Sequence, residues 1–500
     1  MTTPIQKTPV HHHTRLTTPL LMFAVIITVL GCATGPQPAD ELQSEGASMD
    51  AIVGTWSGTV DAGGQQVTLV FNLSDDDGRL AATMDSPAQG AKGIPVDEAV
   101  FDDDRLTLRL PQMGATYTGV LTEDQTAVEG VFSQGGMEFD LVLTRGYTAT
   151  ETRRPQDPQP PYPYEVEEIR FTNPDAGITL AGTITRPGGE GHFPAVVLIS
   201  GSGQQNRDEE VFGHRPFHVI ADALTRAGIV VLRYDDRGVG ESGGAETLAE
   251  MTTRDSAGDA AAALAYLEGR AYVDHRRAGL IGHSEGALIA LMIATGGQTD
   301  ESGRPVVPID VDPDFIVLLA GNGVPGDELL LMQSRAILEA TGASAEQIEA
   351  IAAANRRIYD LVLSGAPHDE VATEIDEILT EAGVPANQIE LQRNQILSPW
   401  IEFFLRYDPA GDLRRVEVPV LALIGGLDLQ VPAEQNLPAI RAALAEAPVE
   451  DVTVRELPGL NHLFQPAQTG AVEEYGQIET TIDPSVLELV AGWITERFAE

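Results

Sequence analysis

The stretch LIGHSEGALIALMIA, residues 280–294, decides the fold of this chain. It reads as the end of an apolar strand, then the pattern Gly-x-Ser-x-Gly at 282–286, then an apolar helix. That order is typical of a sharp strand-to-helix turn, which exposes the serine hydroxyl above a sheet. The flanking glycines let strand and helix approach closely around a strained residue. Ser284 is therefore the candidate nucleophile, and a purely structural turn is the alternative.

The same pentapeptide pattern occurs a second time at residues 240–244, around Ser242. The polar residues 235–238 precede it, and a polar, Gly-rich stretch follows. No apolar strand or helix flanks this copy, so we expect a loop there and no nucleophile.

Strands and helices alternate along the chain on both sides of Ser284. Apolar runs expected to form strands are 195–199, 229–232, 280–281, 315–319, 420–424 and 452–454. Helices are expected at 217–224, 257–267, 287–294 and 434–444, with a last one that Asp483 and Pro484 begin. This alternation predicts an α/β domain over residues 165–500, with a mostly parallel sheet flanked by helices. The interval at about 324–397 interrupts this alternation of strands and helices. We expect it to contain two or three helices and to form an inserted cap.

The part of the chain before residue 165 has a different pattern. Residues 51–147 alternate apolar and polar side chains between turn-rich breaks, which predicts a small antiparallel β domain, a sandwich or a barrel. The run of Asp residues at 75–77 is expected to be a hairpin turn rather than a calcium loop. Residues 148–164 are Pro-rich and are expected to form an extended, fairly stiff linker.

A serine hydroxyl becomes a good nucleophile when a histidine accepts its proton and an acid holds that histidine. In sheets with this kind of turn, the acid and then the histidine follow the serine along the chain. Only His368 and His462 follow Ser284. His368 lies in an acidic part of the predicted cap, whereas His462 lies in a loop after the strand at 452–454, so we predict that His462 is the base.

Asp428 is the predicted acid, because it lies in the Gly-Gly-Leu-Asp loop that leaves the strand at 420–424. The competing acids precede that strand or fall past the turn; they are Asp408, Asp412, Glu434 and Asp451.

From about residue 165 to the C-terminus, the elbow, acid and histidine motifs resemble those of the α/β-hydrolase family. More narrowly, SGSGQ at 200–204, RYDDRG at 233–238 and GLNH at 459–462 resemble capped esterases grouped with serine aminopeptidase-like hydrolases. Some of those proteins carry a β-rich N-terminal domain. The resemblance implies the fold and the catalytic machinery, but it does not specify a substrate.

The tetrahedral intermediate of acyl transfer needs two N–H donors for its oxyanion. One is expected from the backbone of Glu285. The other is assigned to Ser202, with Gln204 as the alternative, and the structural reading is that the glycines of this loop only turn the chain. Arg237 is interpreted as structural.

Two groups of apolar side chains near the predicted cap could have either of two roles, which are packing in the core and forming an acyl-binding wall. The first group is Trp400, Phe403, Phe404 and Tyr407, and the second is Leu329, Leu330, Leu331 and Met332.

Residues 1–32 read as a signal segment with a positively charged start and a short apolar run. The run ends at Val29-Leu30-Gly31-Cys32, which resembles the end of a bacterial lipoprotein signal, and Cys32 is the single cysteine. The resemblance implies that Cys32 is lipidated, that 33–50 is a tether, and that the protein is exported and anchored to the envelope. Ala33 favours the outer membrane or cell surface over the inner membrane. An ordinary signal peptide and an uncleaved anchor are the alternatives.

The chain has 500 residues, 43% of them hydrophobic, which suits a globular protein of more than one domain. Its net charge of −44 disfavours nucleic acid as a partner. We therefore predict hydrolysis of a small carboxylic ester through an acyl-enzyme on Ser284, without metal or organic cofactor, and membrane contact through the lipid anchor only. The alternatives are a serine peptidase or aminopeptidase of the same fold and a non-catalytic surface-binding lipoprotein.

Overall fold

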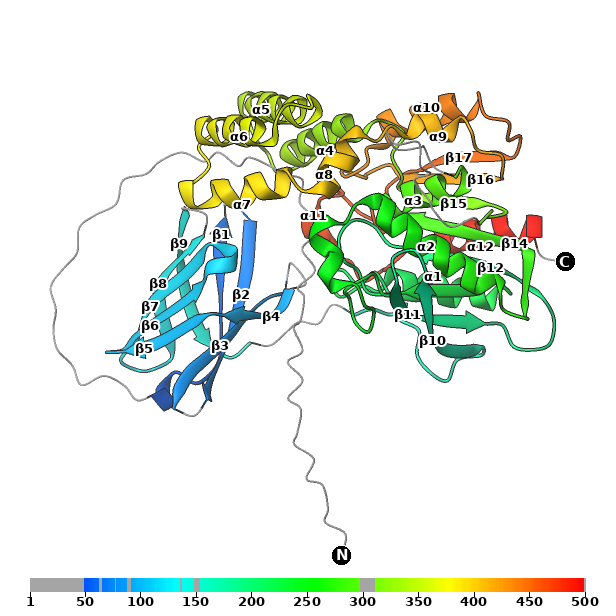
Figure 1. Ribbon diagram of the computed structural model, residues 1–500. Helices are drawn as coiled ribbons and strands as arrows, with labels where there is room; N and C mark the ends of the chain where they lie inside the picture. The colour runs from blue at the N-terminus through cyan, green and yellow to red at the C-terminus, as the bar shows by residue number, and fades with distance from the viewer. Residues whose placement is uncertain are drawn as a thin grey trace, which may run out of the picture.

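The computed structural model describes residues 49–62, 65–76, 78–87, 91–134, 137–147, 153–296 and 311–498. Two folded parts lie side by side, a β domain and a larger α/β domain (Figure 1). This arrangement confirms the predicted fold class. The predicted signal segment and Cys32 lie outside the described residues.

The β domain is a single antiparallel sheet with the strand order β4-β3-β2-β1-β9-β8-β7-β6-β5. Alternate side chains are buried, as the period of two predicts, and Leu106 and Leu108 of β6 are fully buried together with Trp56 and Tyr117. The Gly78 N–H donates to Asp75 Oδ1 (2.7 Å) in the hairpin turn expected there. The strands are β1 (Gly54–Ala62), β2 (Gln65–Asp76), β3 (Arg79–Ser86), β4 (Ala91–Val96), β5 (Glu98–Asp102), β6 (Arg105–Leu110), β7 (Ala115–Leu121), β8 (Ala127–Gln134) and β9 (Met137–Arg145), with short 3-10 turns at η1 (Met49–Ala51) and η3 (Pro111–Met113).

The described part of the linker is attached to the α/β domain by hydrogen bonds from Arg154. The Arg154 guanidinium donates to the carbonyl oxygens of Phe212 (2.9 Å), Gly476 (2.9 Å) and Ile478 (2.8 Å). Its Nε also donates to the Gly213 carbonyl (3.3 Å). One side chain therefore joins two loops that are far apart in the sequence.

The sheet of the α/β domain has the order β10-β11-β13-β12-β14-β15-β16-β17, and the strands from β13 to β17 are parallel. Each predicted strand is present. Sequence reasoning missed the antiparallel hairpin of β10 and β11 at one edge, because most of β10 is exposed and carries no apolar run. The strands are β10 (Glu165–Asn173), β11 (Ile178–Arg186), β12 (Phe193–Ile199), β13 (Val230–Tyr234), β14 (Val273–His283), β15 (Ile316–Leu319), β16 (Val420–Gly425) and β17 (Val452–Leu457).

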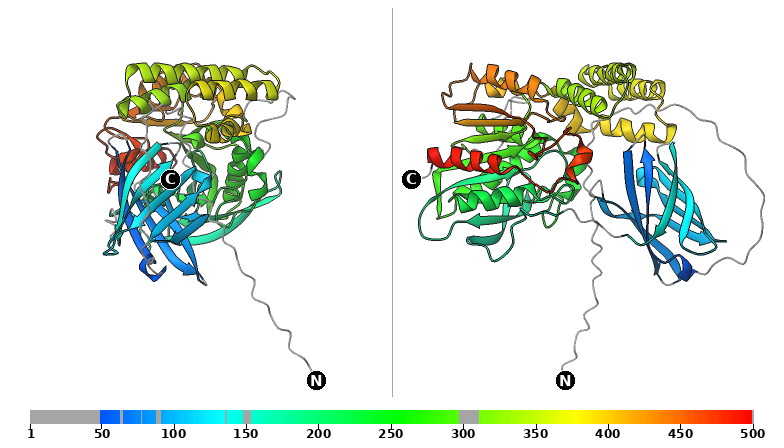
Figure 2. Two further views of the ribbon diagram at one scale, coloured as in Figure 1. Left: turned by 90° about the vertical axis from the view of Figure 1, so that its left-hand side faces the viewer. Right: turned by 180° about the vertical axis from the view of Figure 1, so that it is seen from behind.

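Helices cover both faces of this sheet (Figures 1 and 2). In β12, Val196 and Leu198 pack toward α1 (Pro216–Arg226) and α12 (Pro484–Phe498). Val197 and Ile199 pack toward the other face. Because both faces are buried, the strand needs a continuous apolar run. The second face is covered by α2 (Thr253–Glu268), α3 (Glu285–Ala294) and α10 (Ala433–Leu444), while η4 (Ala245–Glu250) and α11 (Val472–Tyr475) are short.

The cap between β15 and β16 holds four helices within residues 324–397, all of which the structure describes, rather than two or three. They are α4 (Gly326–Ala340), α5 (Ala345–Leu363), α6 (His368–Glu381) and α7 (Ala386–Ile396), and α8 (Pro399–Arg406) and α9 (Pro409–Leu413) lead back to β16. The three turns between the four contain Gly342, Gly365 and Gly383, with φ of 79°, 70° and 80°. Glycine ends a helix readily in that left-handed conformation, so these glycines separate the helices.

Arg237 is structural, as predicted. Its guanidinium binds both carboxylate oxygens of Asp259 at 2.7 and 2.9 Å, and Asn173 donates to the same carboxylate at 2.7 Å. Arg237 and Asp259 are 3% and 2% exposed. This buried pair ties the loop after β13 to α2 and to the end of β10.

Replacing Arg237 by Gln leaves the Asp259 carboxylate buried without its counter-charge. We expect Arg237→Gln to lower the free energy of unfolding by about 3–5 kcal/mol, measured by chemical denaturation. Arg170→Gln is the matched control, because Arg170 and its partner Glu241 are both exposed, and we expect a loss of about 1 kcal/mol or less. Equal losses in the two variants would contradict the structural role of Arg237.

Candidate active site

Ser284 lies at the sharp turn between β14 and α3, as predicted. Its backbone has φ 54° and ψ −119°, and its N–H donates to the Leu319 carbonyl at 2.8 Å. A residue with a side chain is strained in this conformation by about 1–3 kcal/mol and persists only where its surroundings hold it. The turn directs the serine away from the helix and into a cavity at the carboxyl end of the sheet.

The glycines of the turn are required by close backbone contacts. A Cβ at Gly282 would overlap the carbonyl oxygen of Gly286, and a Cβ at Gly286 would overlap the carbonyl oxygen of Ile199. The prediction that these glycines let strand and helix approach closely is confirmed.

His462 and Asp428 form a buried pair in the loops that follow β17 and β16. His462 Nδ1 lies 2.8 Å from Asp428 Oδ2, and the two residues are each 4% exposed. Asp428 Oδ1 accepts the N–H groups of Gln430 and Val431, both at 2.8 Å, which fixes the carboxylate. Because a carboxylate only accepts, Nδ1 carries the proton and Nε2 of the neutral ring is left as a base.

One cavity of about 140 Å³ is lined by Ser284, His462 and Ser202, and Asp428 lies behind His462. The structure thus brings together residues that are far apart in the sequence. The cap and α8 supply the apolar side of this cavity, with Leu329, Leu330, Tyr359, Ile396, Ile401 and Phe404.

The two residues predicted to supply oxyanion donors, Ser202 and Glu285, line the same cavity as Ser284. A Cβ at Gly201 would lie 3.2 Å from the Ser284 Cβ, so this loop passes directly beside the serine. Gln204, the alternative donor, is exposed and lines a neighbouring cavity of about 610 Å³ instead. Ser202 therefore lies in the same cavity as Ser284, whereas Gln204 lies in the neighbouring one.

The Glu285 side chain belongs to the wall between these two cavities. Its Oε1 accepts the Thr253 hydroxyl at 2.7 Å and the Trp400 indole N–H at 2.8 Å. Burial raises the pKa of Glu285, and hydrogen bonds from Thr253, Trp400 and Ser202 oppose that rise. Trp400 and Glu285 line both cavities, so their hydrogen bond joins α8 to the residue after Ser284.

The members of the aromatic group divide between the cavity wall and the core. Trp400 and Phe404 stack on each other (5.1 Å between ring centroids) and line the cavity. Phe403 stacks on Tyr407, whose hydroxyl donates to buried Asp412. Of the second group, Leu329 and Leu330 line the cavity, whereas Leu331 and Met332 pack against the core.

Most of the rejected candidates have structural partners, and the remaining two are exposed. The Ser242 hydroxyl donates to the Asp235 carbonyl (2.7 Å) and accepts the Ala181 N–H (2.9 Å) in a loop, as expected. Asp451 pairs with Arg497 at 2.7 Å. Asp412 is bound by Tyr407 and Arg415, and Asp408 caps α9. Glu434 and His368 are exposed, near the starts of α10 and α6 respectively.

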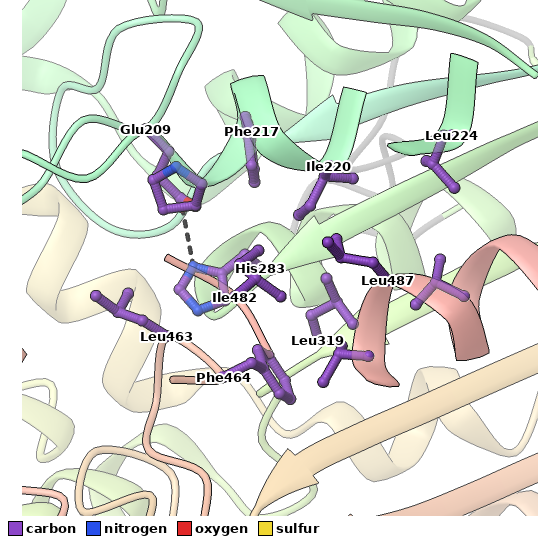
Figure 3. A pocket seen from close by; sticks show the side chains of 13 residues that line it. Glu209, Phe217, Ile220, Leu224, His283, Leu319, Leu463, Phe464, Ile482 and Leu487 are labelled. Carbon is purple, nitrogen blue, oxygen red and sulfur yellow. Dashed lines mark hydrogen bonds and ion pairs between the residues drawn. The ribbon is translucent and has the colours of Figure 1, made fainter. Parts of the chain in front are cut away.

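Sequence reasoning missed one pair of residues beside the site. Glu209 Oε1 lies 2.9 Å from Nδ1 of His283, the residue before Ser284, and both side chains are buried (Figure 3). Glu209 stands in the charged run 207–210, where an acidic residue is normally expected to be solvated. Only the position of His283 inside the elbow could have drawn attention to this pair.

Residues 196–474 match the sequence profile of the alpha/beta hydrolase family, and the match spans more than half of the chain. The chain therefore belongs to this family and is a hydrolase. It is similar to Esterase EstD of Thermotoga maritima, with 26% identity over 335 residues, covering 67% of this chain and 70% of that protein. Among solved structures it is similar to the alpha/beta hydrolase GrgF from Penicillium sp. sh18 (18% identity, TM-score 0.39, 67% of this chain and 100% of that one). It is also similar to the Pyrococcus furiosus esterase Pf2001 (15% identity, TM-score 0.38, 67% and 92%).

The strain at residue 284 predicts a difference in stability between two variants. In Ser284→Gly, the left-handed backbone no longer meets a Cβ, whereas Ser284→Ala keeps the strain. We expect the Gly variant to be more stable than the Ala variant by about 1 kcal/mol. Calorimetry of the two purified variants measures this difference, and an Ala variant as stable as the Gly variant would show that the turn is unstrained.

Proposed function

We propose that this protein is a serine esterase, which cleaves carboxylic esters through an acyl-enzyme on Ser284. The observation that carries the proposal is the strained Ser284 in one cavity with a histidine that a fixed carboxylate holds by Nδ1. The similarity to a protein named as an esterase supports the same function.

In the proposed reaction, Ser284 Oγ attacks the ester carbonyl carbon while His462 Nε2 takes the hydroxyl proton. The backbone N–H groups of Ser202 and Glu285 stabilise the oxyanion that forms on the carbonyl oxygen. His462 then gives the proton to the departing alkoxide, which leaves as the alcohol. A water molecule, activated by His462, hydrolyses the acyl-enzyme by the same steps, and Asp428 keeps the imidazole oriented throughout.

The shape of the cavity favours an uncharged acyl group of modest size. Its wall from the cap and α8 is largely apolar, with Gln333 as a polar member, and the hydrogen-bonded Trp400 and Glu285 line both this cavity and the larger neighbouring one. The chain carries a large negative charge, which disfavours an anionic substrate.

The purified protein should hydrolyse p-nitrophenyl esters of short and medium acyl chains faster than aminoacyl p-nitroanilides. We expect Ser284→Ala to lower kcat/KM by about 10⁵-fold and to abolish labelling by a fluorophosphonate, because the nucleophile is gone. Ser242→Ala is the matched control, since it removes the serine of the second pentapeptide, and it should keep the labelling.

The other outcomes separate the alternatives. A preference for the aminoacyl anilides, with Ser284 still required, would replace the esterase proposal by a serine aminopeptidase. A folded protein that no fluorophosphonate labels would support the non-catalytic surface-binding lipoprotein.

We also propose that the protein is exported and anchored to the bacterial envelope through lipid on Cys32. The support is the sequence before Cys32. As a separate finding, no helix in the described part of the chain has the length and apolar character needed to cross a membrane. In a bacterial host, labelled palmitate should be incorporated into the wild-type protein and not into Cys32→Ser. Incorporation into both proteins, or into neither, would contradict the anchor.

A further inference from the structure

His283 makes two hydrogen bonds, both to oxygens that accept. Nδ1 lies 2.9 Å from Glu209 Oε1, and Nε2 lies 3.0 Å from the carbonyl oxygen of His462. A neutral imidazole has one N–H and can satisfy one of these acceptors. With Glu209 ionised, both bonds require the doubly protonated ring, so the geometry describes a buried imidazolium directly before Ser284.

The surroundings of His283 strengthen this pair. Phe217, Ile220, Leu319, Leu463 and Phe464 line an apolar pocket beside the ring (Figure 3), and His283 is 7% exposed. In such an apolar environment the attraction between opposite charges is larger than in solvent.

The two carboxyl groups near the ring, Glu209 and Asp428, favour a charged His283. Burial alone would lower the pKa of His283, but the charge and hydrogen bond of Glu209, the His462 carbonyl and the charge of Asp428 raise it above its ordinary value. The His462 ring is the other titratable group facing it, at 4.8 Å between ring centroids.

Glu209 also holds the loop that carries Ser202. Its Oε1 accepts the Gly201 N–H at 2.8 Å, so the same oxygen binds the loop and the histidine. Glu209 has φ 51°, a left-handed conformation that a residue with a side chain adopts only where its contacts hold it. The left-handed backbone of Glu209 is therefore better explained by the contacts that its side chain makes than by its own conformational preference.

These contacts form one chain of hydrogen bonds, from Gly201 N–H to Glu209, from His283 to Glu209, and from His283 to the His462 carbonyl. The chain joins the three segments that carry Ser202, Ser284 and His462 in the proposed function. The two side-chain bonds of His283 span 74 and 179 residues of sequence, so no local structure could replace them.

We propose that Glu209 and His283 are positioning residues, an ion pair that sets the distances among the oxyanion loop, the nucleophile and the base. This inference rests on the proposed serine hydrolase function. Neither side chain takes part in a bond-breaking step. Their role is to keep the reacting groups aligned, and a misalignment of about 1 Å can cost about 100-fold in rate.

The test compares Glu209→Gln with Glu210→Gln in the full chain. Glu210 is the exposed neighbour, so its variant removes the same charge without touching the site. We expect Glu209→Gln to lower kcat and the rate of fluorophosphonate labelling by about 10- to 100-fold, with KM changed less than about twofold. Glu210→Gln should behave as the wild type.

The pH profile adds a readout that a merely structural role would not move. The imidazolium is present below the pKa of His283, and Glu209 raises that pKa, so the aligned site persists to higher pH in the wild type. Without the Glu209 charge the pKa falls, and the alkaline fall of kcat should therefore move to lower pH in Glu209→Gln. It should not move in Glu210→Gln.

The ionisation of His283 can be measured directly by ¹⁵N NMR of histidine-labelled wild-type protein, with its signal assigned by its loss in His283→Asn. Two protonated ring nitrogens at a pH just above the ordinary pKa of histidine, about 6.5, support the proposal. A neutral ring, or Glu209→Gln with wild-type kcat and pH profile, would overturn it, and the NMR result decides even where the variant fails to fold. A wild type that is unreactive toward fluorophosphonate would refute the proposed function instead.

Discussion

The close approach of β14 and α3 around Ser284 is the constraint on which the rest of the site depends. Gly282 and Gly286 have no room for a Cβ, because backbone oxygens occupy that space. The strand therefore meets the helix at a turn that only a strained backbone can make, and Ser284 is held there by its bond to Leu319. All the loops that meet at the cavity are arranged around this fixed point.

Much of the fold could be predicted from the sequence because burial on both faces leaves a strong signal. Runs such as 195–199 are apolar throughout, and only a strand covered by helices on each side needs that composition. The hairpin of β10 and β11 lacks this signal, since it lies at the sheet edge and β10 is largely exposed. The cap helices were undercounted because the Gly342, Gly365 and Gly383 turns were not recognised as helix ends.

The positions of Ser284, Asp428 and His462 could be predicted because each follows a strand whose end is fixed by the sheet. The Glu209–His283 pair could not, because it depends on a contact between residues 74 apart that no periodicity or motif records. The burial of Glu209 results from tertiary packing. The sequence does not indicate it, because Glu209 stands in a run of charged residues that would normally be exposed. The exclusion of Ser242 followed from its polar flanks, and its two backbone hydrogen bonds account for its presence in the loop.

Arg154 shows that the linker between the two folded parts does more than separate them, because this residue is hydrogen-bonded to the α/β domain. Its guanidinium holds the carbonyls of Phe212 and Gly476, and Phe212 and Tyr475 form part of the cavity wall. A shortened protein beginning at Glu165 would keep every strand of the α/β sheet but would lose the hydrogen bonds from Arg154 to the loops that form that wall. The hydrogen bonds that hold this cavity wall therefore come partly from a residue upstream of the sheet, which a definition by strands and helices alone would leave out.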